Sequence, residues 1–107
     1  MINQRDIVEV PFNLRQGVRV HPAIVLSTNE AIEQEGSFIA MMMTTDDAYD
    51  EYSYELTNAM LRKELHVPFC QARVHLLSFF HDYEVISNFN YKNSVRQKFF
   101  DELIGIA

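Results

Sequence analysis

The chain has 107 residues, 48% of them hydrophobic and 22% charged, which excludes a disordered protein and fits one domain with a single core. The net charge of −6 disfavours nonspecific nucleic-acid binding, so any such site must be a local cluster among the nine Lys and Arg residues. No apolar stretch approaches the roughly 18 residues of a bilayer span, and the N-terminal residues "MINQRD" lack the basic-then-apolar order of a secretory signal. We expect a cytoplasmic protein with one domain, residues 1–107, and no membrane partner; its single cysteine, Cys70, agrees with a reducing compartment.

The first half of the chain predicts two strands separated by a loop. Apolar and polar residues alternate over 6–12, and a five-residue loop ending in Gly17 leads into a long strand over 18–27. Pro22 lies inside this second strand. Because proline cannot donate a ladder hydrogen bond, we expect it to break the strand and turn it around a corner.

The middle of the chain predicts a short helix and two more strands. Asn29 is a candidate cap for a helical piece that Gly36 ends. The apolar run over 37–45 predicts a strand covered on both faces, with its methionines in the core. After an acidic turn, an outer strand is expected to end near Leu56.

The last third predicts a strand over 70–80 and two helical pieces. Alternation places four strand residues on one face: Cys70, Ala72, Val74 and Leu76. Asp82 is a candidate cap for a short helix through Ile86. A closing helix capped by Asn93 or Ser94 has a predicted apolar side of Val95, Phe99, Leu103 and Ile104. We expect a mainly β fold, a small, curled antiparallel barrel with short helices and a C-terminal α-helix.

The order of these segments resembles the MazF/PemK family of toxin endoribonucleases. The resemblance is carried by "DIVEVPF", a loop ending in glycine, "VRVHPAIVLS", an apolar strand ending in Thr44, and "ARVHLLSFFHDYEVI". It implies an SH3-like barrel that forms a homodimer and is silenced by an antitoxin peptide segment. The implied activity is cleavage of single-stranded RNA, without a metal or other cofactor, by attack of the ribose 2′-OH on the adjacent phosphate.

The resemblance also implies site residues. Thr44 and Arg73 match the family's pattern, and Arg19 matches a basic residue two positions before the family's arginine. His21 stands where that arginine is expected before the proline, and His75 stands where some members have an aspartate. We predict His21, Thr44, Arg73 and His75 as catalytic residues, and Arg19, Arg73 and Tyr49 as contacts to phosphate or base.

The two histidines leave two interpretations open. A histidine can act as base or acid near neutral pH, whereas arginine stays charged, so two histidines with two arginines suit phosphodiester cleavage. Alternatively, loss of the family's arginine removed the activity and left a protein-binding module, or a structural dimerising domain with no site.

Structural roles are alternatives for the individual residues as well. Thr44 has a hydroxyl suited to capping the turn before Asp46. Arg73 is placed to pair with a neighbouring carboxylate on a solvated face. The tyrosine-rich acidic segment 44–55 is either a solvated hairpin or a base-stacking wall whose carboxylates restrict where RNA lies.

Two further patterns concern metal binding and assembly. Four ligand-type residues fall close together, namely His66, Cys70, His75 and His81, but their spacing matches no familiar zinc pattern. An excess of late apolar residues is expected to pair with a second copy in a homodimer, through Phe79, Phe80, Phe89 and Tyr91.

Overall fold

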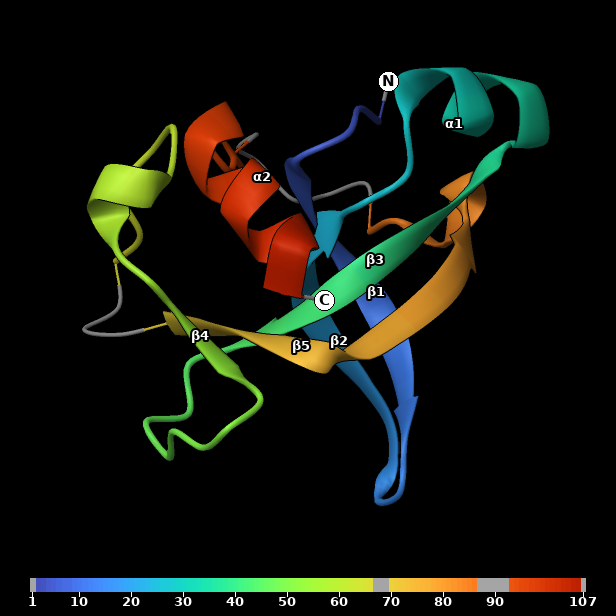
Figure 1. The fold of residues 1–107 in the computed structure, drawn as a ribbon. Helices are drawn as coiled ribbons and strands as arrows, with labels where there is room; N and C mark the ends of the chain where they lie inside the picture. Colours follow the sequence, from blue (N-terminus) through green and yellow to red (C-terminus); the bar gives the residue numbers. More distant parts are fainter. Residues whose placement is uncertain (1, 67–69, 87–92, 107) are drawn as a thin grey trace.

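The computed structural model describes residues 2–66, 70–86 and 93–106 of the chain (Figure 1). Its strands are β1 (Asp6–Leu14), β2 (Gly17–Val25), β3 (Ser37–Thr44), β4 (Ser53–Leu56), β5 (Cys70–His81) and β6 (Asn93–Ser94). Its helices are α1 (Asn29–Glu35), α2 (Gln97–Ile106) and two 3₁₀ turns, η1 (Asn58–Met60) and η2 (Asp82–Glu84). None of the described helices is both long and apolar enough to cross a membrane.

The strands form one antiparallel sheet in the order β4-β5-β3-β2-β1-β6. The prediction of a mainly β fold with a C-terminal helix is therefore confirmed. Within the described residues the sheet is not closed, because its outer strands β4 and β6 do not pair with each other. Residues that follow β4 do contact the β6 region. Leu61 and Val95 form an isolated antiparallel bridge, and the Arg62 N–H donates to the Ser94 carbonyl at 2.9 Å.

Each face of the sheet carries its own apolar core, because alternate side chains of the inner strands point to opposite faces. On the α2 face, Phe100 and Leu103 of the helix cover Ile7, Ile24, Met41, Met43 and Ala72, among others. On the α1 face, Ile32 packs with Val8, Val10, Phe12, Ala23, Val25, Phe38, Ala40, Met42 and Phe80. The methionines of β3 therefore divide between two cores, as expected for a strand covered on both faces.

Pro22 does not break β2, which corrects the prediction of a corner there. Pairing with β1 runs along the whole strand and includes Glu9 opposite Pro22. Pairing with β3 begins only at Ala23. The Leu26 N–H donates to the Ile39 carbonyl, so alternation directs the nitrogen of Pro22 toward β3 as well. The proline thus ends the β2–β3 ladder, and the β1–β2 hairpin continues beyond it as a two-stranded ribbon (Figure 1).

A bulge in β5 interrupts the predicted alternation of side chains between the two faces of that strand. The register with β3 changes between Met41 opposite Leu77 and Met43 opposite Ala72. Residues before the bulge follow the prediction, and Val74 packs on the α2 face. Leu76 packs on the α1 face instead, so the predicted single face over residues 70–76 is wrong at its end.

The helices differ from the prediction in their caps and buried faces. Thr28, not Asn29, caps α1, and its hydroxyl accepts from the Ala31 N–H at 3.3 Å. Gly36 ends α1 as predicted, with a left-handed φ of 65° that favours glycine. In α2, Phe100 is a core residue that the periodicity did not indicate, and Ile104, predicted on the apolar side, is 42% exposed.

Candidate functional site

Four of the predicted site residues share the α1 face of the sheet. Thr44 lies two positions after Met42 on β3, and His21 lies two positions before Ala23 on β2, so alternation places both on this face. Arg19 lies two positions before His21 on β2, so alternation places it on the same face. Arg73 alternates with Ala72, whose side chain is on the α2 face, and so belongs to the α1 face as well.

His21 lies just beyond the end of the β2–β3 ladder. Its side chain is half-buried, and its ring meets the edge of Phe12 with the centroids 6.1 Å apart. Continuing the register from Ala23 opposite Met42 would bring His21 opposite Thr44. Among the described residues, no hydrogen bond joins His21 to Thr44 or Arg73. The fold brings the three to one face without locking His21 to the others.

Thr44 lies at the end of β3, opposite Gln71 of β5. Its Oγ1 accepts a hydrogen bond from the Asp46 N–H at 3.3 Å. This bond has the form of the turn-capping role that the sequence left open. The hydroxyl hydrogen of Thr44 is not used in that bond and stays available to orient an acceptor.

Arg73 is enclosed by acceptors. Its guanidinium makes a two-pronged pair with Asp50, from Nη1 to Oδ1 at 2.9 Å and from Nη2 to Oδ2 at 3.1 Å. Nη1 also lies 3.0 Å from Ser53 Oγ and 3.0 Å from Gln71 Oε1. The Arg73 side chain is only 15% exposed, against 51% for Asp50. Hydrogen bonding from Arg73, followed by that from the Tyr52 N–H, lowers the pKa of Asp50 to about 2.

Gln71 is a residue of this site that the sequence analysis missed. It is 1% exposed, and its Nε2 donates to the carbonyls of Asp46 at 2.9 Å and Ala48 at 3.3 Å. Its Oε1 accepts from Arg73, so one buried amide holds both the loop 45–52 and the arginine. The available signal was its position two residues before Arg73, which places both side chains on the same face of the strand.

His75 and the tyrosines of the acidic segment lie at the rim. His75 is exposed within the bulge of β5, and its ring centroid lies 4.5 Å from that of Tyr52. Tyr49 is 45% exposed in the loop 45–52. Partial desolvation, and then the charge of Glu55, raise the pKa of its hydroxyl, which keeps it a neutral donor.

The four ligand-type residues noted for zinc do not converge. Within residues 2–66, 70–86 and 93–106, no group of three His, Cys, Asp or Glu side chains is arranged to hold a metal ion. Cys70 is buried, and desolvation raises its pKa to about 11. His81 stacks instead on Tyr83, with the ring centroids 5.0 Å apart and the planes 5° from parallel.

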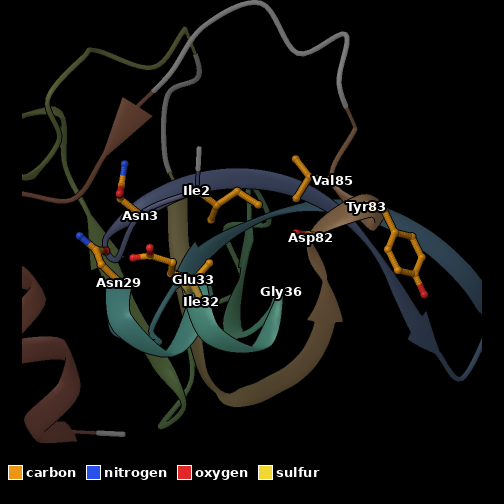
Figure 2. Close-up of a pocket in the computed structure, with 9 residues that line it drawn as sticks. All are labelled: Ile2, Asn3, Asn29, Ile32, Glu33, Gly36, Asp82, Tyr83 and Val85. Carbon is orange, nitrogen blue, oxygen red and sulfur yellow. The ribbon is translucent and has the colours of Figure 1, made fainter.

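A cavity of about 780 Å³ opens elsewhere, between the N-terminal segment, α1 and η2 (Figure 2). Ile2, Ile32 and Val85 give it apolar walls, and Glu33 and Asp82 contribute carboxylates. None of the predicted site residues lines it. This cavity and the predicted site residues therefore lie in different places.

No protein-family model matches the chain, and no curated protein matches it significantly. Solved structures do match, among them the following two. An endoribonuclease in complex with its cognate antitoxin, from a mycobacterial species, aligns with a TM-score of 0.69 and 10% identity, over 99% of this chain and 90% of that one. A MazE–MazF complex from Deinococcus radiodurans aligns with a TM-score of 0.67 and 15% identity, over 97% and 90%. Similarity over nearly the whole length of both chains shows that this protein has a MazF-like fold.

Proposed function

We propose that the protein is the toxin of a toxin–antitoxin pair, an endoribonuclease that cleaves single-stranded RNA without a metal ion. The observation that carries the proposal is the placement of His21, Thr44 and Arg73 on one face of a MazF-like sheet. Fold alone does not specify chemistry, so the proposal depends on these side chains.

The proposed reaction is an internal transfer at phosphorus. The 2′-oxygen of the ribose attacks the adjacent phosphate, the bond from phosphorus to the 5′-oxygen breaks, and a 2′,3′-cyclic phosphate and a 5′-hydroxyl result. One of His21 and His75 takes the 2′-OH proton, and the other protonates the leaving oxygen. Arg19 and Arg73 neutralise the phosphate, Thr44 orients it through its hydroxyl, and Tyr49 stacks on a base.

The test is incubation of the purified protein with a mixed-sequence RNA in EDTA, followed by mapping of new ends. We expect cuts at a short recurring sequence, with cyclic phosphate on one side and 5′-hydroxyl on the other. Cleavage that requires an added divalent ion, or ends that carry a 5′-phosphate, would contradict the proposed mechanism.

A second function is favoured by the contacts of Arg73 and Thr44. Asp50, Ser53 and Gln71 already accept from the guanidinium, and the Thr44 oxygen accepts from the loop. A protein with these groups permanently occupied is an inactive MazF-like module that binds another protein. This alternative predicts antitoxin binding with no RNA cleavage under any condition.

The proposed partners are an antitoxin segment and a second copy of the chain. Three apolar side chains are exposed beside one another at the β3–β5 pairing: Ile39 (38%), Leu77 (45%) and Phe79 (54%). They support a homodimer through this surface. Phe80, also predicted there, is 3% exposed and packs in the α1-face core, so that assignment is wrong. Phe89 and Tyr91 lie outside the described residues.

A further inference from the structure

The Asp50 carboxylate meets the Arg73 guanidinium in the arrangement that a bound phosphate would also adopt. A guanidinium binds carboxylate and phosphate in the same way, through two parallel N–H donors facing two oxygens. Asp50 supplies both oxygens here, at 2.9 and 3.1 Å. We propose that Asp50 is an internal anion that occupies the phosphate-binding side of Arg73, and that a nucleic-acid phosphate binds only by displacing it. This inference rests on the proposed function.

The contacts that would remain after displacement come from strands. Ser53 Oγ belongs to β4 and Gln71 Oε1 to β5, and both lie 3.0 Å from Arg73 Nη1. Ser53 and Arg73 are also direct partners in the β4–β5 ladder. The guanidinium therefore stays aimed toward the loop when Asp50 leaves.

The contacts that must break involve the loop 45–52, which has no strand or helix of its own. Its first half is held separately, through the bonds from Gln71 to the carbonyls of Asp46 and Ala48. The Asp50 side chain is 51% exposed. Asp50 Oδ1 also accepts from the Tyr52 N–H at 2.9 Å and from the Ser53 hydroxyl at 3.3 Å, so release of Arg73 requires a movement of the Asp50 side chain within the turn 50–53.

This arrangement lowers the affinity of the wild-type protein for phosphate. The competing carboxylate is tethered in the same chain, so it acts at a high effective concentration. The apparent dissociation constant for phosphate equals the intrinsic constant divided by the fraction of molecules in which Asp50 has released Arg73. Removing the negative charge of Asp50, while keeping the fold of the loop, should raise phosphate affinity.

Asp50→Asn is the variant that separates these effects. An asparagine retains Oδ1, which accepts from the Tyr52 N–H at 2.9 Å, and loses only the charge and the second anionic oxygen. Asp47→Asn is the matched control, because it removes the same charge from the same loop at a residue with no hydrogen bond to Arg73 among the described contacts. Should Asp50→Asn fail to fold, Asp50→Ser keeps a short acceptor at the turn and takes its place.

The experiment is a titration of each protein with inorganic phosphate, followed through the NMR signals of the arginine side chains, with Arg73→Lys to assign the signal. We expect the Asp50 variant to bind phosphate at Arg73 about tenfold more tightly than wild type and Asp47→Asn, as loss of a charge-assisted competitor implies. Equal affinities in the three proteins overturn the inference, whatever RNA they cleave. Tighter phosphate binding without any RNA cleavage upholds the inference and defeats the endoribonuclease proposal.

Discussion

The two sides of the candidate site differ in how firmly their charged groups are held. On the β5 side, Arg73 is 15% exposed and bonded to three side chains. On the β2 side, Arg19 is exposed, and the ring of His21 meets the edge of Phe12 with no side-chain hydrogen bond among the described residues. Each group is paired through its backbone on one side only, Arg73 with Ser53 of β4 and His21 with Val10 of β1. Side-chain hydrogen bonds thus preorganise one half of the site, whereas the other half, beyond the end of the β2–β3 ladder at Pro22, is free to adjust to a ligand.

The largest effect is expected on the free side. His21→Ala should lower the rate of RNA cleavage by about 10²- to 10⁴-fold, the usual cost of losing a general acid or base. The midpoint of thermal unfolding should change little, because His21 is only half-buried. Cleavage of a fluorescent RNA measures the rate, with exposed His66→Ala as the control. Equal loss in both variants would remove His21 from the mechanism.

On the held side, the largest effect should come from Gln71. Gln71→Ala removes the partner of two loop carbonyls and of Arg73 from a site that is 1% exposed. One unsatisfied buried group costs about 1–3 kcal/mol, and the exposed Asp46 and Ala48 can bond to water instead, so we expect the free energy of unfolding to fall by about the cost of one group. Urea denaturation measures it. Gln97→Ala, at an exposed position, serves as control. A comparable loss of stability in that variant would contradict a specific stabilising role of the buried Gln71 amide.

Pro22→Ala should reduce the difference in order between the β2 side and the β5 side of the candidate site. It restores an N–H facing β3, where the Met43 carbonyl continues the ladder. A new hydrogen bond contributes about 0.5–1.5 kcal/mol, and loss of the proline's constraint on the unfolded chain offsets about 0.4–1 kcal/mol. Overall stability should therefore stay nearly constant while the hairpin becomes more ordered.

Hydrogen exchange measures that ordering directly. The new amide at position 22 should be protected, and RNA cleavage should slow. Pro11→Ala is the control: the Glu9 carbonyl accepts from the Ile86 N–H on the side away from β2, so alternation directs the nitrogen at position 11 to that same side. Fast exchange of the amide introduced by Pro22→Ala would mean that the proline is not what ends the ladder.

The smallest effect is the acid sensitivity of the held side. The pKa of Asp50 is lowered from 3.8 to about 2 in the folded protein, chiefly by Arg73. Its stabilisation is thus fully present above pH 3.8 and is lost as the pH falls toward 2. Melting curves between pH 5 and about 2 should show a steeper loss of stability for wild type than for Asp50→Asn. Parallel curves would place the acid sensitivity in other carboxylates.

The sequence pattern predicted the features that depend only on residues close together in the chain. The two-sided burial of β3 follows from its unbroken apolar run, and the end of α1 follows from Gly36. Pairing partners were not predictable in the same way. The end of the β2–β3 ladder, the β5 bulge and the Asp50–Arg73 pair all depend on which strand lies alongside which. Sequence alternation thus placed Arg73 on its face and left its partner unknown.

The most direct test of a site that joins the two halves is a crystal structure with a short RNA whose 2′-hydroxyls are replaced by hydrogen, which blocks the attack. We expect a phosphate bonded to Arg73 in place of Asp50, with His21 and Thr44 within hydrogen-bond reach of the same nucleotide. An oligonucleotide bound away from these three residues, with the Asp50–Arg73 pair intact, would contradict a shared site.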